Sequence, residues 1–323
     1  MTHAIDLASL AEEGEALDRA ARAPTTLRQY HRFWFHFENW CRDAGGFQSL
    51  PAHPDTVALY AVWLARRLLP STISVHLAAI SYMHVEAGYE PPSATNAVRR
   101  RMSGIRRSKP FVVRRKAPLT LDLLDHAIDD LGSTKHHLQR RALLLLGFAA
   151  ALRRSELVGL NYGSDHGGGS GFVTFTADGL EVVIRKSKTD QEAKGVVIAI
   201  PFRKDHRRCP VRALRTWLDA ADIREGPIFR RILDGHNGKI GSRLRPAAVN
   251  CAVRWAAKRC GLPPENFAGH SLRAGYVTSA SKAGASVSAI QATTRHRKVD
   301  TVFVYIRSVN RFRDSALNLM PGW

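Results

Sequence analysis

The chain has 323 residues, 45% of them hydrophobic, and its 48 lysines and arginines against 28 acidic residues give a formal net charge of +20. This length and composition predict a folded, soluble protein with room for two domains. The longest apolar run, residues 142–152, is shorter than the roughly 20 residues that span a bilayer, and the N-terminus lacks the features of a secretory signal. We expect a protein of the bacterial cytoplasm or nucleoid, with no membrane partner.

Several kinds of site have no signature in this chain. The four cysteines are scattered without a C-x-x-C pair, so no zinc site is indicated. There is no G-x-x-x-x-G-K-[ST] and no H-E-x-x-H, and "GHSLR" lacks the closing glycine of a nucleophile elbow. The usual signatures of nucleotide hydrolysis, zinc proteolysis and esterase chemistry are therefore missing.

The positive charge is distributed unevenly along the chain. Residues 1–18 carry five acids and no lysine or arginine, whereas residues 99–116 carry nine bases and no acid. A protein that neutralises phosphates gains free energy from released counterions, and the arginine fork pairs phosphate oxygens two at a time. The pattern favours a nucleic-acid partner over general solubility.

The first third of the chain is predicted to form a helical domain. Residues 1–21 are expected to form a mobile or weakly helical tail. Apolar residues then recur at helical spacing over 25–45, 53–68, 69–89 and 93–107, with Gly45 and Gly88 as stop signals. These four helices predict an all-helical domain over residues 22–108, in which Trp34, Trp40 and Trp63 are interpreted as core.

The remaining two thirds are predicted to form a basic linker and a mixed α and β domain. A basic linker over 109–117 precedes a domain over 118–323, whose segment 138–160 is apolar on every side, as in a buried central helix. Runs at 171–176, 180–187 and 196–201, with a turn at Asp178-Gly179, predict three antiparallel strands. The remaining segments read as helices, and the last, about 312–320, is amphipathic. The predicted fold is mainly α with a small antiparallel β-sheet.

Basic and polar residues recur at the edges of these second-domain elements. Arg153 precedes Glu156 by three residues, Lys188 lies between two predicted strands, and a His-x-x-Arg motif lies further along. The set, in chain order, is Arg153, Glu156, Lys188, His270, Arg273, His296 and Tyr305. From about residue 25 onward, this order and spacing resemble the tyrosine recombinase, or phage integrase, family, and the Cre recombinase branch in particular. The resemblance implies a two-domain, C-shaped DNA clamp with a helical, SAM-like core-binding domain and an α+β catalytic domain.

The resemblance also implies a chemistry for the set. Tyr305 would attack the scissile phosphate, forming a 3′-phosphotyrosine and releasing a 5′-hydroxyl. Arg153 and Arg273 would clamp the non-bridging oxygens of the transition state, and His296 would donate a further hydrogen bond. Because fixed cations stabilise the charge and the phosphotyrosine conserves the bond energy, no metal ion, ATP or other cofactor is expected.

Proton transfer and positioning fall to the remaining members. Lys188 would protonate the leaving 5′-oxygen, although Lys186 is a near competitor. His270 would serve as base or proton partner for the nucleophile, and Glu156 would orient a neighbouring arginine or histidine. Because Arg153 and Arg154 are adjacent, the choice of Arg153 rests on its spacing to Glu156.

Two positions depart from the family pattern. Arg295 and Ala151 stand where glycine is common. An arginine at position 295 is expected to change how this turn approaches the phosphate, which bears on the role of His296. The cations around Tyr305 are expected to steer and hold the DNA backbone or to support docking. They are Arg295, Arg297, Lys298, Arg307, Arg311 and Arg313.

DNA contacts and assembly complete the predictions. The candidate contact residues are Arg99, Arg100, Arg101, Arg106, Arg107, Arg114, Arg115, Lys116, Arg243, Arg245, Arg254 and Lys258. The resemblance implies double-stranded DNA with paired inverted-repeat sites, a homo-tetramer on synapsed DNA, and a monomer or weak oligomer when free. The C-terminal helix would dock on a neighbouring protomer or on its own domain.

Three alternatives stay open at this point. A type IB topoisomerase shares the nucleophile and the arginines but rejoins the same strand as a monomer. A DNA-binding protein without catalysis and a metal-dependent nuclease or transposase are the others. The leading prediction is a site-specific recombinase acting through a Holliday junction.

Overall fold

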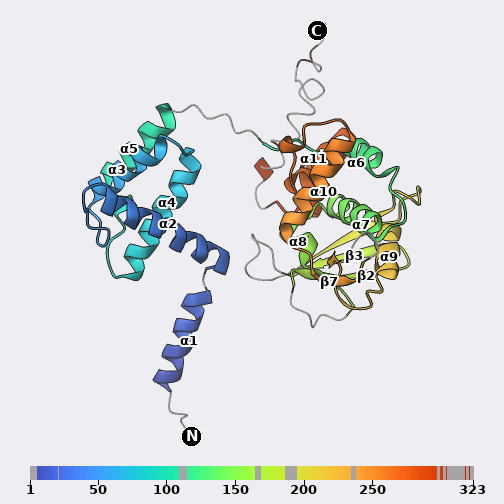
Figure 1. Ribbon diagram of the computed structural model, residues 1–323, viewed down its shortest axis with the longest axis horizontal. Helices are drawn as coiled ribbons and strands as arrows, with labels where there is room; N and C mark the ends of the chain where they lie inside the picture. The colour runs from blue at the N-terminus through green and yellow to red at the C-terminus, as the bar shows by residue number, and fades with distance from the viewer. Residues whose placement is uncertain are drawn as a thin grey trace. The chain divides into compact units, whose positions relative to one another are not determined.

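The computed structural model describes residues 6–20, 22–108, 115–163, 169–185, 195–233 and 238–296, together with residues 299, 300, 303, 317 and 320. The chain divides into two compact units, Met1–Arg114 and Arg115–Trp323 (Figure 1). Within the described residues, no helix is long and apolar enough to cross a membrane.

The first unit is helical throughout. Its helices are α1 (Leu7–Ala20), α2 (Pro24–Asp43), α3 (Pro54–Ala65), α4 (Pro70–Glu86), the 3₁₀ turn η1 (Pro92–Ala94) and α5 (Asn96–Ser108). Where the sequence predicted a mobile or weakly helical tail, residues 7–20 form α1. Three of these helices begin with proline, whose fixed φ suits the first turn and whose missing N–H would have no helical partner there.

The core of this unit lies where α2 packs on α4 and α3 packs on α5. Trp34 is buried at 7% exposure, and Phe37 and Tyr60 are fully buried. Trp63 stacks on Tyr60 with ring centroids 5.9 Å apart but is 39% exposed. The tryptophan interpretation therefore holds for Trp34, whereas Trp63 lies at the edge of the core.

Two histidines are buried in this core. Nδ1 of His76 lies 3.0 Å from the Tyr60 hydroxyl, and Nε2 of His84 accepts the Ala52 N–H at 2.8 Å. Burial, helped by the charges of His36 and Arg32, lowers the pKa of His76 to about 4. His76 is therefore neutral at pH 7 and contributes packing.

Helix α5 carries the basic run predicted to contact nucleic acid. Val98, Met102 and Ile105 form its buried face at helical spacing. The exposed arginines on the rest of its surface are Arg99, Arg100, Arg101, Arg106 and Arg107. The helix thus packs through one stripe and leaves five cations in solvent.

The second unit combines helices with a small sheet. Its helices are α6 (Leu121–Ile128), α7 (Lys135–Ala149), α8 (Arg154–Gly159), α9 (Pro210–Ala220), α10 (Pro246–Arg259), η3 (Pro264–Asn266), α11 (His270–Lys282) and α12 (Val287–Thr294). Its strands are β1 (Leu160–Tyr162), β2 (Gly171–Phe175), β3 (Gly179–Ile184), β4 (Val196–Pro201), β5 (Gly226–Pro227), β6 (Arg230–Ile232) and β7 (Ile240–Arg243). The predicted fold class, mainly α with a small antiparallel-rich sheet, is confirmed.

The main sheet has the strand order β4-β3-β2-β1-β5. β2, β3 and β4 form the predicted antiparallel meander, in which Val173 pairs with Val182 and Val182 with Ile198. β1 is parallel to β2, and β5 is antiparallel to β1. β1 and β5 escaped prediction because two or three residues are too few for an alternating pattern.

Helix α7 forms the centre of the second core. The run Leu143–Leu146 is buried, and the helix packs against α9 and α11. Helix α11 in turn lies directly against the segment that enters the unit, because a Cβ on Gly275 would stand 1.8 Å from the Leu119 carbonyl oxygen. This close approach fixes α11, which carries two of the predicted site residues.

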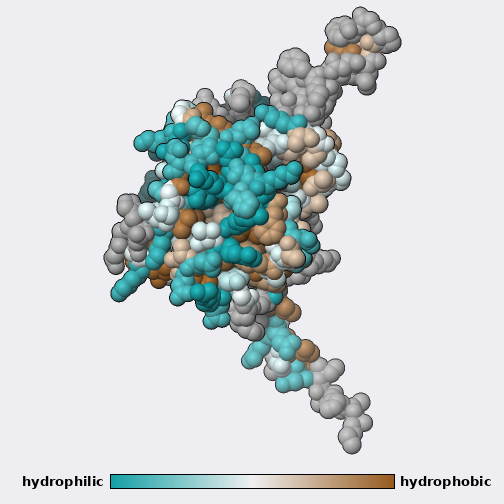
Figure 2. Space-filling view, turned by 90° about the vertical axis from the view of Figure 1, so that its right-hand side faces the viewer, coloured by the Kyte–Doolittle hydropathy of each residue, from teal (hydrophilic) through white to brown (hydrophobic). Residues whose placement is uncertain are grey.

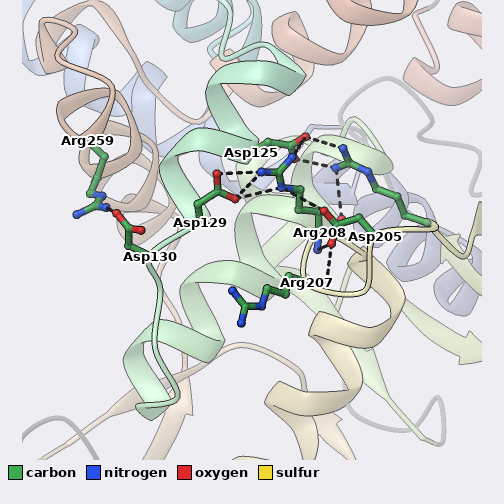
Figure 3. Close-up of polar contacts among 8 residues, drawn as sticks. Asp125, Asp129, Asp130, Asp205, Arg207, Arg208 and Arg259 are labelled. Atoms are coloured by element: carbon green, nitrogen blue, oxygen red, sulfur yellow. Dashed lines mark hydrogen bonds and ion pairs between the residues drawn. The ribbon is translucent and has the colours of Figure 1, made fainter.

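A cluster of ion pairs ties α6 to the segment before α9 (Figure 3). Arg203 binds Asp125 through two hydrogen bonds of 2.7 and 2.5 Å, and Arg208 binds Asp129 with a shortest distance of 2.7 Å. The face of this unit shown in Figure 2 is covered mainly by hydrophilic side chains with hydrophobic ones between them. Because Arg203 and Arg208 are bound to carboxylates of the same unit, part of the excess of arginine stabilises the fold.

Candidate active site

Arg153 lies in the turn between α7 and α8, and Glu156 lies in the first turn of α8. Arg153 is the N-cap of α8, and its N–H donates to Oε2 of Glu156 at 2.9 Å, as in the carboxylate half of a capping box. Nη1 of Arg153 donates to Oε1 of the same carboxylate at 2.6 Å. The neighbouring Arg154 is exposed. This geometry supports Arg153 as the member of the adjacent pair that belongs to the site.

Helix α11 begins at His270, and Arg273 follows three residues later on the same face of the helix. Only 2% of the surface of Arg273 is exposed. Its Nη1 donates to the carbonyl oxygen of Ala151 at 2.8 Å, across 122 residues of sequence. Ala151 holds a left-handed backbone with φ 47°. This turn, which the family pattern would fill with glycine, aims a carbonyl at Arg273 and brings α11 against the Arg153 segment.

His296 lies just beyond α12. Its Nδ1 is 2.9 Å from the hydroxyl oxygen of Thr294, and that hydroxyl donates to the Ile290 carbonyl at 2.8 Å. Because the threonine proton is already used, Nδ1 of His296 carries a proton and donates it. Nε2 is then the acceptor for Nε of Arg273, at 3.3 Å. The ring is thereby fixed in one tautomer, with Nε2 directed at the arginine.

The charges at the site shift the pKa values of its members. Burial, followed by the charges of Arg273, Arg153, His270 and Arg295, lowers the pKa of His296 to about 4. Partial burial and the charges of Arg273, Arg153 and Arg115 also lower the pKa of His270. Both imidazoles are therefore neutral at pH 7. A neutral histidine is suited to accept a proton.

Glu156 remains ionised although its side chain is only 3% exposed. Burial alone would raise its pKa, but the charge of Arg295 and the hydrogen bonds and charge of Arg153 outweigh that effect and lower the pKa. The arrangement is one buried carboxylate that holds arginines from two segments. An anion entering the site would meet fixed cations and two neutral imidazoles.

The structure brings together five of the seven predicted residues: Arg153, Glu156, His270, Arg273 and His296. Lys188 and its competitor Lys186 lie outside the described residues, as do Tyr305, Arg114 and all of the predicted C-terminal helix except residues 317 and 320. Their roles stay predictions. Within the described part of the chain, no cluster of histidine, cysteine and acidic residues is arranged to hold a metal ion.

Among the predicted DNA contacts, Arg243 needs correction. Its guanidinium donates to the carbonyl oxygens of Val158 and Leu160 and, at 2.7 Å, to Oδ1 of Asn161. These bonds join β7 to the start of β1 and leave the group in a structural role. The sequence pattern could not reveal this, because the acceptors lie about 80 residues earlier in the chain.

The other residues of this unit that were predicted to contact DNA are exposed to solvent. Arg245, Arg254 and Lys258 on or beside α10 are exposed, as are Arg115 and Lys116. Nζ of Lys116 donates to the Glu265 carbonyl at 2.6 Å, and the Ala117 N–H donates to the Asn266 carbonyl at 2.8 Å. Residues 116 and 117 of the predicted linker therefore lie against the second unit.

The sequence assigned Arg295 to steering or holding the DNA backbone or to supporting docking, whereas in the structure its side chain is turned inward. Its side chain is 8% exposed and pairs with Glu156 at 3.0 Å. The only signal at the sequence level was an arginine directly before His296 where glycine is common. Nothing local indicated burial, because the partner carboxylate lies 139 residues earlier.

An α+β unit with clustered arginines, histidines and a buried carboxylate agrees with the resemblance seen in the sequence. The phage integrase family model matches residues 119–311. An integrase/recombinase xerD homolog from Selenomonas ruminantium is 38% identical over 93% of this chain and 86% of its own length. The recombinase Cre of Escherichia phage P1 is 24% identical over 94% of this chain and 90% of its own length.

Solved structures agree at the level of the fold. A Tn1549 transposon integrase in complex with transposon right-end DNA has a TM-score of 0.57 at 15% identity, covering 95% of this chain and 98% of that one. A lambda integrase dimer bound to a core site has a TM-score of 0.54 at 19% identity, covering 95% and 96%. The chain belongs to the phage integrase family of tyrosine recombinases, and it is a site-specific recombinase that cleaves and rejoins DNA. The resemblance seen in the sequence is confirmed.

Proposed function

We propose that this recombinase exchanges strands between paired sites in double-stranded DNA, with Tyr305 as nucleophile and the Arg153, Arg273 and His296 cluster as the phosphate-binding site. One observation carries the proposal. Arg273 and His296 are hydrogen-bonded, and Arg153 lies close enough for its charge to depress the pKa of His296. This proximity of three groups from three separate segments supports a shared role in phosphate binding, where a charged transition state would need them.

The proposed residues account for both protons that move in the cleavage step. The phenolic oxygen of Tyr305 bonds to phosphorus as the bond to the 5′-oxygen breaks. His270, which is neutral because its pKa is lowered, accepts the phenolic proton. Lys188 donates a proton to the leaving 5′-oxygen, so that the product is a 3′-phosphotyrosine and a free 5′-hydroxyl. Rejoining reverses these transfers with a 5′-hydroxyl from the partner duplex.

His296 has a specific part in this scheme. In the free protein its Nε2 accepts from Arg273, and its pKa of about 4 keeps it neutral. A phosphate placed beside the arginines adds negative charge, which raises the pKa of the histidine. Protonation at Nε2 would then convert His296 from an acceptor into a donor toward a non-bridging oxygen. We expect this change to accompany DNA binding.

The assembly is proposed on the same basis. The first unit would act as the core-binding half of a clamp through the exposed arginines of α5, and the second unit would be the catalytic half. Four protomers would synapse two duplexes at inverted-repeat arms and pass through a Holliday junction. The segment 312–320 would dock on a neighbouring protomer, so deleting residues 312–323 should leave single-site binding and abolish synapsis.

Trapping on a nicked suicide duplex tests the nucleophile. The wild type should form a covalent complex that resists denaturant, and Tyr305→Phe should bind the same DNA without forming it. Equal trapping by both proteins would overturn the assignment of Tyr305. Retention of trapping in EDTA is expected, and a strict need for a divalent ion would instead favour a metal-dependent nuclease.

A strand-exchange assay separates recombination from relaxation. Two differently labelled duplexes that carry the site should yield recombinant products and a four-way intermediate. Relaxation of supercoiled DNA without exchange between the labelled duplexes would indicate topoisomerase-like rejoining of the same strand. DNA binding with neither product would indicate a protein that binds without catalysis.

A further inference from the structure

Arg295 combines two features that each carry a free-energy cost. It is the C-cap of α12 and has a left-handed backbone with φ 55° and ψ 40°, a conformation that non-glycine residues rarely adopt. Its side chain is 8% exposed, so a guanidinium charge is held largely out of water. A residue kept in such a position needs a compensating interaction.

That interaction is the Glu156 carboxylate. Nη2 of Arg295 donates to Oε2 of Glu156 at 3.0 Å, while Arg153 donates to Oε1 through Nη1 at 2.6 Å and to Oε2 through its backbone N–H at 2.9 Å. Nε and Nη1 of Arg295 are buried without a hydrogen-bond partner among the residues that the structure describes. Within that part of the protein, the guanidinium is directed at the carboxylate and makes no alternative bond.

We propose that Arg295 is a positioning residue for strand cleavage, which binds the Glu156 carboxylate together with Arg153 and so fixes Arg153 where the phosphate binds. The proposal rests on the proposed function of Arg153. With Arg295, the site holds three arginines (Arg153, Arg273 and Arg295) and one carboxylate, which leaves two net positive charges, whereas Arg153 and Arg273 alone would leave one. Arg295 thus restores the attraction for phosphate that a lone carboxylate would partly cancel.

The test measures the rate of covalent-complex formation in a single turnover, with the nicked duplex saturating. Arg295→Gly removes the guanidinium and at the same time suits the left-handed backbone, so the variant should fold with an unfolding midpoint close to that of the wild type. We expect its rate to fall about 10- to 100-fold, the cost typical of losing an outer partner of a functional group. Arg295→Lys, which keeps the charge, should recover part of the rate.

A double-mutant cycle decides whether Arg295 acts through Glu156. In a Glu156→Gln background, which is itself slow, Arg295→Gly should change the rate by less than about threefold, because the two residues act as one unit. Equal losses in both backgrounds would show that Arg295 acts independently and would overturn the proposal. A wild-type rate for Arg295→Gly would overturn it as well.

The pH profile supplies a readout that a purely structural role would not move. The charge of Arg295 helps to keep the pKa of Glu156 low. Without it, burial should raise that pKa, so the cleavage rate of Arg295→Gly should decline at a higher pH than that of the wild type as the medium is acidified. Superimposable profiles would contradict the proposal.

Two controls complete the design. Arg231→Met removes an exposed arginine from the same unit and should leave the saturated cleavage rate unchanged. Tyr305→Phe and the wild type report on the proposed function alone, because absence of a wild-type covalent complex would reject the nucleophile assignment. A functional wild type with an unaffected Arg295→Gly would reject only the role of Arg295.

Discussion

The hydroxyl of Thr294 offers the sharpest test of how the site is organised, because it connects His296 to the end of α12. Thr294 is fully buried, donates to the Ile290 carbonyl at 2.8 Å and accepts from Nδ1 of His296 at 2.9 Å. Thr294→Val keeps the shape of the side chain and removes both interactions. It leaves the imidazole N–H without its acceptor, and the preference for the Nδ1-protonated tautomer should weaken, because only the bond from Arg273 to Nε2 then favours it.

The expected magnitudes follow from these two bonds. A net hydrogen bond contributes about 0.5–1.5 kcal/mol, and a buried donor left unsatisfied costs about 1–3 kcal/mol, so the free energy of unfolding should fall by about 1–3 kcal/mol. The rate of covalent-complex formation should fall about 10- to 100-fold, as for other groups that orient a functional histidine. DNA binding should change little, because the positive charges remain.

The assay is single-turnover trapping on a nicked suicide duplex, with urea unfolding of the same preparation. Thr293→Val is the matched control, because the adjacent hydroxyl accepts from Tyr276 at 2.9 Å and does not contact His296. It should lose comparable stability and keep its cleavage rate. A wild-type rate for Thr294→Val, or an equal loss of rate in both variants, would refute the reasoning about His296.

Three further predictions follow. Because the folded pKa of His76, about 4, is below its ordinary 6.5, its contribution to stability is complete above pH 6.5 and is lost as the pH falls to about 4. The loss should reach about 3 kcal/mol, and urea unfolding of His76→Gln should show a smaller loss over this range. If the two proteins lose stability equally, His76 is not the group responsible. Arg100→Gln, on the exposed face of α5, should weaken DNA binding and reduce the slope of log K against log salt by up to about 0.9. Arg243→Met should instead lower the free energy of unfolding by about 1–3 kcal/mol with an unchanged slope, and the reverse result in a salt titration would contradict both assignments. Gly275→Ala should destabilise the second unit by about 1–3 kcal/mol, because its Cβ would collide with the backbone of Leu119. If Gly275→Ala unfolds at the same urea concentration as the wild type, the close packing of Gly275 on Leu119 is contradicted.

The sequence alone determined the family, the fold class and five members of the site now seen together. It could do so because the decisive signals are local. Arg153 and Glu156 are three residues apart, and so are His270 and Arg273, so each pair lies within one helical turn. Helical periodicity and the charge contrast between residues 1–18 and 99–116 are likewise properties of neighbouring residues.

Only the tertiary structure decided what each cation does. Arg295 and Arg243 look like other basic residues in the sequence, yet one binds Glu156 and the other binds the Val158–Asn161 segment. Their partners lie about 80 to 140 residues away, and no spacing rule reaches that far. The hydrogen bond from Arg273 to Nε2 of His296 likewise joins α11 to the segment after α12 through residues 23 positions apart. Burial and pairing are products of folding, because they arise when distant segments exclude water from the same place.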